Sequence, residues 1–327
     1  MIRVLYAGSP EASAVTLKLL VEKASDAGYE IAGVLTNSPT AKGRHKELVP
    51  TPVGLAAREL GLPVFEPEHL DAAAREAVKE INPDIMVVFA YGHIFGPKFM
   101  ELFRFGGINL HPSALPVYRG CTPVNAAILN GDSETAFTIQ KVSKALDEGN
   151  ILAQQKVALD GSETAGSLLN DAAVKGAELI AGILSETSIN NEIKEGDVQQ
   201  GTPSYTGFIK KEDAEINWNK TAVEIDRLVR GYYPEPAAWT KEGENILKIM
   251  SGTTVSDEDA LALGADLSSK PGTVALFSKA KGILIRCGGS FYAVTKLQRQ
   301  GKSVMDYKSF MNGARDFTGS LLGHMKG

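Results

Sequence analysis

Asn109 and His111 stand two residues apart at the end of an apolar run, residues 106–111, that has the composition of a buried strand. Because side chains alternate along a strand, these two point to one side and Leu110 points to the other. An amide and an imidazole on one face can donate hydrogen bonds to an oxygen on which negative charge develops. A third polar group, Asp147, follows in the loop ALDEG between two further predicted strands. These residue types indicate a site that stabilises an oxyanion and moves protons.

The same three residues do not fit a hydrolase triad. No Ser or Cys of the sequence stands in the strand–turn–helix context of a nucleophile elbow. When an amine is itself the nucleophile, no covalent intermediate is needed, and the protein has only to bind the oxyanion and manage protons. We therefore interpret Asn109, His111 and Asp147 as residues for transfer of an acyl group to an amine. Taken alone, His111 could equally be a structural histidine at a strand end.

Short apolar runs alternate with helical patterns through the first half of the chain. The predicted strands cover residues 2–8, 29–36, 63–67, 84–91, 106–111, 136–142 and 150–159, and the predicted helices cover 15–23, 72–81 and 167–184. Strands that alternate with helices pair in parallel, since each helix carries the chain back across the sheet. The pattern predicts an open, mostly parallel α/β sheet of Rossmann-like type. In such sheets ligands bind beyond the carboxyl ends of the strands, where Asn109 and His111 fall.

A polar segment, residues 190–207, follows the last of these helices and contains glycines and Pro203. Such a composition is typical of a linker. We therefore expect a catalytic domain over 1–189 and a second domain over 208–327. The second domain has a helical pattern near 222–229 and several short strands separated by glycines, which predicts a small C-terminal β-barrel.

Charge is unevenly distributed along the chain. The formal net charge of the 327 residues is −5, yet from Lys270 to the end ten Lys and Arg stand against two acids, a local charge of +8. Further basic residues lie in an unusually long connection, 37–54, after the second predicted strand. A basic region on an acidic protein indicates a polyanionic partner such as a nucleic acid, although a solvated charged surface has the same composition.

Several other classes of protein are disfavoured. The first predicted turn, AGSPEAS at 7–13, has one glycine where a dinucleotide fold needs G-x-G-x-x-G. Cys121 and Cys287 have neither disulfide-framework nor zinc-ligand spacing. No stretch reaches the roughly 18 apolar residues of a membrane span, and the first residues lack the pattern of a leader. We expect a cytoplasmic protein that contacts no membrane and uses no metal or nicotinamide cofactor.

Four stretches of the sequence resemble motifs of the methionyl-tRNA formyltransferase family. They are AGSPE at 7–11, VVFAYGHI at 87–94, INLHPSALPVYRG at 108–120 and ALDEGNIL at 145–152. Their order and spacing agree with that family over nearly the whole chain. The resemblance implies a formyltransferase domain followed by an OB-like domain that binds tRNA. It also implies transfer of the formyl group of 10-formyltetrahydrofolate to the amino group of methionine on initiator tRNA, without a metal.

The resemblance assigns roles to individual residues. Asn109, His111 and Asp147 would be the three catalytic residues. From their chemistry we expect Asn109 and His111 to donate hydrogen bonds to the formyl oxygen, and Asp147 to orient His111 and favour its protonated form. The folate would lie against two stretches, which are Phe89, Ala90, Tyr91 and Gly92, and Ser113, Ala114, Leu115 and Pro116. The long basic connection would contact tRNA through Lys42, Arg44 and Lys46. We expect a monomer.

Three other functions stay open on the sequence alone. A formyltetrahydrofolate hydrolase or a sugar-amine N-formyltransferase uses related folate chemistry, but neither requires the basic loop at 42–46 or the basic C-terminal region. A non-enzymatic RNA-binding protein would account for the basic regions. It would not account for Asn109, His111 and Asp147 together.

Overall fold

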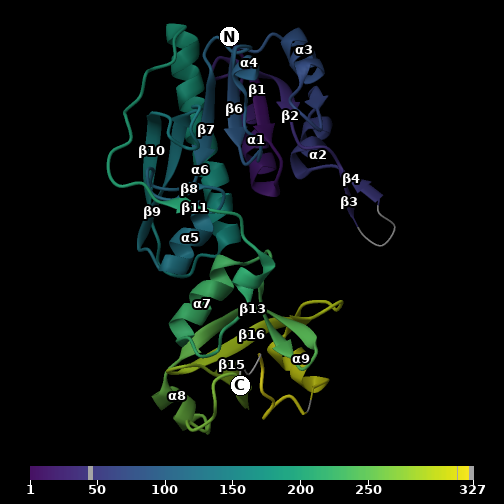
Figure 1. The fold of residues 1–327 in the computed structure, drawn as a ribbon, viewed down its shortest axis with the longest axis vertical. Coiled ribbons are helices and arrows are strands. Elements are labelled where there is room, and N and C mark those ends of the chain that lie inside the picture. Colours follow the sequence, from purple (N-terminus) through teal and green to yellow (C-terminus); the bar gives the residue numbers. More distant parts are fainter. Residues whose placement is uncertain (43–46, 315, 324–327) are drawn as a thin grey trace. The chain divides into compact units, whose positions relative to one another are not determined.

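The computed structural model describes residues 1–42, 47–314 and 316–323. By its contacts the chain divides into two compact units (Figure 1). The first comprises Met1–Pro123, Glu134–Ala158 and Ser167–Gly207, and the second comprises Val124–Ser133, Leu159–Gly166 and Phe208–Gly327. Residues 190–207, which we expected as a linker, have their contacts in the first unit. The division of labour between a folate-binding and a tRNA-binding domain stays a prediction.

The first unit is built on a seven-stranded sheet with the order β10-β9-β7-β6-β1-β2-β5 (Figure 1). Its strands are β1 (Ile2–Gly8), β2 (Tyr29–Leu35), β5 (Val64–Phe65), β6 (Ile85–Phe89), β7 (Gly107–His111), β9 (Glu134–Lys141) and β10 (Ile151–Ala158). The pairs from β5 to β7 are parallel, whereas β9 runs antiparallel to both β7 and β10. The predicted open, mostly parallel sheet is confirmed.

Helices cover both faces of this sheet, which is why the central strand β6, IMVVF, is apolar and buried throughout. The helices that carry residues of the first unit are α1 (Glu11–Lys23), α2 (Pro52–Glu59), α3 (Ala72–Glu80), α4 (Pro97–Met100) and α6 (Ala165–Asn190). Leu5 and Val88 pack with residues of α3 and α4 on one face. On the other face α6 lies so close to β7 that a Cβ added to Gly176 would stand 2.3 Å from a methyl group of Leu110. Leu110 therefore faces α6, and its neighbours Asn109 and His111 face the opposite side.

Local sequence signals set the starts of two of these helices. Thr51 precedes α2 and accepts a hydrogen bond from the Gly54 amide at 3.0 Å, with Pro52 in the first helical turn. Asp71 accepts one from the Ala74 amide at 3.0 Å and begins α3 in the same way. Such caps satisfy amides that have no partner within the helix.

The long connection from residue 37 to 54 contains regular structure that the sequence did not indicate. It contains the antiparallel strands β3 (Thr40–Lys42) and β4 (Glu47–Val49), and α2 begins at Pro52. Strands of three residues are too short to show a period in the sequence, so periodicity did not reveal them. Arg44 and Lys46 lie outside the described residues.

The second unit contains an antiparallel sheet with the order β12-β13-β16-β15-β14, and β17 pairs with β16. Its strands are β12 (Ala238–Glu242), β13 (Asn245–Val255), β14 (Val274–Ser278), β15 (Gly282–Arg286), β16 (Phe291–Arg299) and β17 (Met305–Asp306). The helices are α5 (Pro123–Asn130), α7 (Ala222–Gly231), α8 (Asp257–Ala262) and α9 (Tyr307–Asn312), with a 3-10 turn at Lys211–Ala214. The predicted small β domain is confirmed as an antiparallel sheet, and its OB-like character stays a prediction.

The core of the second unit forms where α7 packs on this sheet. Thr221 and Glu224 form a capping box that begins the helix. Ile225 and Val229 then bury one face of α7 in a cluster that includes Tyr292 of β16. Among the described residues of both units, no helix combines the length and the apolar character needed to cross a membrane.

Candidate active site

The carboxyl end of β7 lies between β6 and β9. β6 runs parallel to β7, and Val88 pairs with Asn109. On the other side β9 pairs antiparallel with β7 and sets Gln140 opposite Asn109. The chain after β7 returns through the short strand β8 (Arg119–Gly120), and the chain after β9 forms the turn that carries Asp147. Because β9 is antiparallel to β7, its last residue, Lys141, pairs with Ile108 near the start of β7. The turn that follows β9 then folds back and brings Asp147 to Asn109 and His111.

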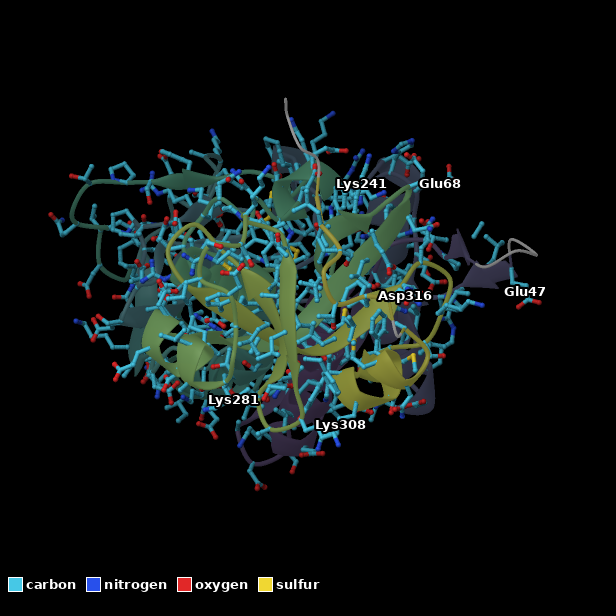
Figure 2. All side chains as sticks on the ribbon, turned by 90° about the horizontal axis from the view of Figure 1, so that it is seen from below. Glu47, Glu68, Lys241, Lys281, Lys308 and Asp316 are labelled. Atoms are coloured by element: carbon cyan, nitrogen blue, oxygen red, sulfur yellow. The ribbon has the colours of Figure 1, made fainter. Side chains whose placement is uncertain are left out.

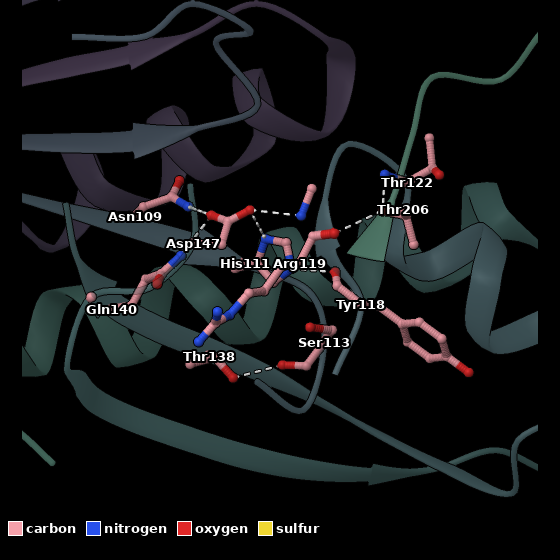
Figure 3. A network of polar contacts seen from close by, with 12 residues as sticks. Asn109, His111, Ser113, Tyr118, Arg119, Thr122, Thr138, Gln140, Asp147 and Thr206 are labelled. Carbon is pink, nitrogen blue, oxygen red and sulfur yellow. Dashed lines mark hydrogen bonds and ion pairs between the residues drawn. The ribbon is translucent and has the colours of Figure 1, made fainter. Parts of the chain in front are cut away.

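Asp147 is the acceptor on which this site converges (Figure 3). Gln140 Nε2 donates to its Oδ1 at 2.7 Å, and the Gly120 amide donates to its Oδ2 at 2.8 Å. Asn109 Nδ2 lies 3.4 Å from Oδ1, and His111 Nδ1 lies 3.6 Å from Oδ2. The side chains of His111 and Asp147 are only 5% and 9% exposed. The structure thus brings together the three residues that the sequence singled out.

His111 has partners at both ring nitrogens. Its Nε2 stands 2.9 Å from the carbonyl oxygen of Tyr118, so this nitrogen carries a proton and donates it. Burial lowers the pKa of His111 below its ordinary value, while the charge of Asp147 and the Tyr118 carbonyl act in the opposite direction. Asp147 does favour the protonated ring, as expected, but burial acts more strongly. Burial therefore favours the neutral ring, and in the tautomer that donates from Nε2 the unprotonated Nδ1 faces the carboxylate.

The two stretches expected to hold the folate follow β6 and β7, which are neighbours in the sheet. Phe89 ends β6, and Ala90 and Gly92 then take left-handed backbone conformations with φ of 53° and 87°. A Cβ added to Gly92 would meet nothing within 4 Å, so the space beside this backbone is open. Between them, the buried ring of Tyr91 stacks on Phe95 with centroids 5.5 Å apart.

The stretch from Ser113 to Pro116 is fixed by a hydrogen bond from β9 and by one within the loop. Thr138 Oγ1 donates to the Ser113 carbonyl at 2.6 Å, and Ser113 Oγ donates to the Val117 carbonyl at 2.6 Å. Ser113, Leu115 and Pro116 are buried, while Ala114 is half-buried. The structure therefore fixes this loop at the same edge of the sheet as Phe89 to Gly92, and leaves the contact with folate as a proposal.

Sequence reasoning missed four groups that shape this site. They are the Gln140 side chain, the Gly120 amide, Arg119 and Gln199. Gln140 could have been found, because it lies on the same alternation of β9 that faces Asn109. Arg119 donates to Glu148 Oε1 at 2.8 Å and to Gln199 Oε1 at 2.7 Å, which no local pattern indicates.

The residues expected to contact tRNA are only partly described. Lys42 ends β3, while Arg44 and Lys46 lie outside the described residues. In the basic C-terminal region, two arginines form ion pairs with acids from outside that region. Arg286 lies 2.5 Å from Asp257, and Arg299 binds Glu242 through two hydrogen bonds of 2.7 and 2.5 Å. The positive charge available to a partner is thus smaller than the +8 of the sequence.

Lysines supply much of what remains of that charge. Tyr307 of α9 donates to the Lys279 carbonyl at 2.8 Å, which ties α9 to the turn between β14 and β15. This turn carries Lys279 and Lys281, and α9 carries Lys308. Figure 2 shows the side chains of Lys281 and Lys308 on the outside of the ribbon.

Within the part of the chain that the structure describes, no group of three or more His, Cys, Asp or Glu side chains is arranged to hold a metal ion. Cys121 is exposed and Cys287 is buried, and both are free thiols.

The fold and this site define the chain as a formyl transferase. The family model described as "Formyl transferase" matches residues 2–184, and the model "Formyl transferase, C-terminal domain" matches residues 208–315. A methionyl-tRNA formyltransferase from Treponema denticola is 37% identical over 324 residues, which cover 96% of this chain and 98% of that protein. One from Pelotomaculum thermopropionicum is 34% identical over 322 residues, or 98% of each chain. The chain belongs to the methionyl-tRNA formyltransferase family.

Solved structures share the fold at low sequence identity. A methionyl-tRNA formyltransferase from Clostridium thermocellum has a TM-score of 0.55 and 18% identity, and the match covers 77% of this chain and 93% of that one. HypX from Aquifex aeolicus in complex with tetrahydrofolic acid has a TM-score of 0.67 and 13% identity, with 98% of this chain and 48% of that one covered. The sugar 3N-formyl transferase WlaRD has a TM-score of 0.59 and 20% identity, with 93% and 99% covered.

Proposed function

We propose that the protein transfers the formyl group of 10-formyltetrahydrofolate to the α-amino group of methionine on initiator tRNA. The product is N-formylmethionyl-tRNA. The observation that carries this proposal is the convergence of Asn109, His111 and Asp147 at the carboxyl end of β7, in a chain that matches methionyl-tRNA formyltransferases over nearly its full length.

In this proposal Asn109 binds the formyl oxygen as it gains negative charge. Its Nδ2 contact with Asp147 is long, at 3.4 Å, so the amide can donate to a nearer acceptor. One well-placed donor of this kind contributes about 3 kcal/mol to the transition state. While Nδ1 is unprotonated, His111 can act as a second donor only if Nε2 leaves the Tyr118 carbonyl, which lies 2.9 Å away. We therefore assign Asn109 as the main hydrogen-bond donor to the oxyanion.

His111 and Asp147 manage the proton in this scheme. As the amine nitrogen bonds to the formyl carbon, the bond from that carbon to the folate nitrogen breaks, the amine loses a proton and the folate nitrogen gains one. The unprotonated Nδ1 of His111 lies 3.6 Å from Asp147 Oδ2, so a proton that enters the space between these two atoms has an acceptor on each side. A proton bound there is stabilised by the negative charge of Asp147. The amine itself titrates near about 8 and is available without a strong base.

The folate is the co-substrate, and the residues after β6 and β7 fit its binding. Phe89 to Gly92 leave open space beside the backbone, and Ser113 to Pro116 form a fixed loop next to Asn109 and His111. This supports our assignment of both stretches to the folate. Titration of the protein with 10-formyltetrahydrofolate, before and after substitution of Leu115 by Glu, measures the contribution of the second stretch.

We further propose that the second unit, over 208–327, contacts the tRNA together with Lys42, Arg44 and Lys46. A hollow of about 480 Å³ supports this proposal, and it lies wholly within the second unit. Its lining residues are Lys211, Glu235, Pro236, Trp239, Ile246, Lys248, Gln298, Arg299, Gln300 and Gly301. Lys211 and Lys248 bring positive charge to it, so Lys211→Glu and Lys248→Glu should each weaken tRNA binding and reduce its dependence on salt.

The acceptor distinguishes this function from its alternatives. Full-length protein is incubated with 10-formyltetrahydrofolate and, in separate reactions, with initiator methionyl-tRNA, an amino-sugar nucleotide or no acceptor. Formyl transfer to the tRNA supports the proposal. Transfer to the sugar would indicate a sugar-amine N-formyltransferase, and release of formate without an acceptor would indicate a formyltetrahydrofolate hydrolase. Binding of tRNA without any turnover would indicate a non-enzymatic RNA-binding protein.

The place of action and the oligomeric state are also part of the proposal. Because its substrate is a charged tRNA of translation, we propose that the protein acts in the cytoplasm. We also propose that it acts as a monomer, which sedimentation of the full-length protein at several concentrations tests directly.

A further inference from the structure

The turn that carries Asp147 has an unusual backbone conformation. Asp147 has a φ of 53°, in the left-handed region, which a residue with a side chain rarely adopts. Two residues later, Gly149 packs so tightly that an added Cβ would lie 1.7 Å from the Lys141 carbonyl oxygen. A conformation of this kind persists only when surrounding contacts hold it. The side-chain contacts of Asp147 fix its carboxylate but not the backbone beneath it.

Gln199 holds that backbone. Its Nε2 donates to the carbonyl oxygen of Asp147 at 2.8 Å and to that of Gly149 at 2.9 Å. Its Oε1 accepts two hydrogen bonds from Arg119, at 2.7 Å from Nη2 and 3.2 Å from Nε. Arg119 in turn donates to Glu148 Oε1 at 2.8 Å. Gln199 and Arg119 together therefore bind every residue of the turn from Asp147 to Gly149.

The segment around Gln199 is itself fastened to the site. The amide and the carbonyl of Asp197 form hydrogen bonds of 2.9 and 2.8 Å with Ile151 of β10. Further on, β11 (Tyr205–Thr206) pairs in parallel with β8, which carries Arg119 and Gly120. Gln199 therefore lies on a stretch of chain that is anchored on both sides of it.

We propose that Gln199 is a positioning residue, which sets the place of Asp147 in the reaction by holding the backbone of its turn. The chemistry of the amide supports this assignment. Two carbonyl oxygens need a group with two N–H bonds, and the guanidinium of Arg119 needs an acceptor, so a side-chain amide satisfies both sides at once. A carboxylate at this position would meet Arg119 but would turn an oxygen toward the two carbonyls.

Two substitutions separate these contributions. Gln199→Leu removes every hydrogen bond at similar size, and Gln199→Glu keeps the shape and the acceptor for Arg119 but loses both donors. Because a displacement of about 1 Å at a reacting group can lower a rate about 100-fold, we expect each to reduce kcat by about 10- to 100-fold. The KM for 10-formyltetrahydrofolate should change little, since Gln199 contacts neither stretch assigned to the folate. Gln200→Leu is the matched control, because Gln200 is exposed and its side chain donates one long hydrogen bond, of 3.4 Å, to the nearby Val198 carbonyl.

A double-mutant cycle with Asp147→Asn tests whether Gln199 acts through Asp147. If it does, Gln199→Leu should lower kcat by less than about threefold in the Asp147→Asn background, since residues that act as a unit are not additive. Equal losses in both backgrounds, or a wild-type kcat in Gln199→Leu, would overturn the proposal. The inference rests on the proposed function, and the two fail differently. A wild-type protein that transfers no formyl group to methionyl-tRNA refutes the function, whereas active Gln199 variants refute only the positioning role.

Discussion

Gly149→Ala places one methyl group where the turn that carries Asp147 has no room. The added Cβ would lie 1.7 Å from the Lys141 carbonyl oxygen and 2.7 Å from its carbonyl carbon. Both atoms belong to the backbone of β9, so no side-chain rotation relieves the overlap. The turn must move away from β9 if the variant is to fold.

The size of that movement follows from the same distances. An ordinary contact begins at 3.4 Å, so the methyl group and Lys141 must separate by about 1.7 Å. Asp147 stands two residues away and is held by hydrogen bonds of 2.7 and 2.8 Å, which tolerate only a few tenths of an ångström. We therefore expect a kcat lower by about 100-fold, together with a loss of about 1–3 kcal/mol in the free energy of unfolding.

The assay compares two glycines. Formyl transfer to methionyl-tRNA and urea denaturation are measured for the wild type, Gly149→Ala and Gly182→Ala. Gly182 lies within α6, is exposed, and has nothing within 4 Å of an added Cβ. Alanine there should leave kcat unchanged and raise the free energy of unfolding by up to about 1 kcal/mol. A wild-type kcat in Gly149→Ala would show that the place of Asp147 does not limit the reaction.

Three further predictions follow from the site and the loops. Because burial lowers the pKa of His111, the unfolded chain binds a proton below about pH 6.5 that the folded chain does not. The free energy of unfolding should therefore fall as the pH is lowered below about 6.5, and it should fall less in His111→Gln. Equal pH dependence in urea titrations of the two proteins would contradict this. Burial, and then the charge of Asp147, raise the pKa of the exposed Cys121 thiol, so Asp147→Asn should speed its alkylation by iodoacetamide at pH 8. Burial raises the pKa of Cys287 to about 12, so this thiol should stay unmodified in the folded protein. Arg44→Lys should reduce the ratio of kcat/KM for initiator over elongator methionyl-tRNA across a salt series, because only Arg presents a planar fork of donors; an unchanged ratio would make Arg44 a simple phosphate contact.

The elements whose sequences have a regular pattern of apolar residues could be predicted from the sequence. The apolar runs of β1, β2, β6 and β7 gave the parallel sheet, and the alternation in β7 set Asn109 and His111 on one face. The hairpin of β3 and β4 could not be predicted, because each strand has three residues and no period is visible. Regular spacing therefore shows which elements form the sheet, but not the short structures within its connections.

The candidate site was predicted only as far as its side chains belong to recognisable motifs. Asn109, His111 and Asp147 were found in this way. Gln199 was not, because a glutamine in a polar segment with Gly and Pro has the composition of a linker, and its partners are backbone carbonyl oxygens. The lowered pKa of His111 could not be predicted either, since it depends on burial that only the folded chain provides.

A single-turnover measurement tests the central claim most directly. Wild type, Asn109→Ala and His111→Ala are each mixed at saturating 10-formyltetrahydrofolate with a limiting amount of initiator methionyl-tRNA, and formylmethionine is followed over time. Binding of 10-formyltetrahydrofolate to each protein is measured alongside. We expect both variants to bind the folate within a fewfold of wild type and to transfer the formyl group about 100-fold more slowly, because these side chains act on the transition state. Wild-type transfer rates in either variant would contradict the assignment of that residue to the chemistry.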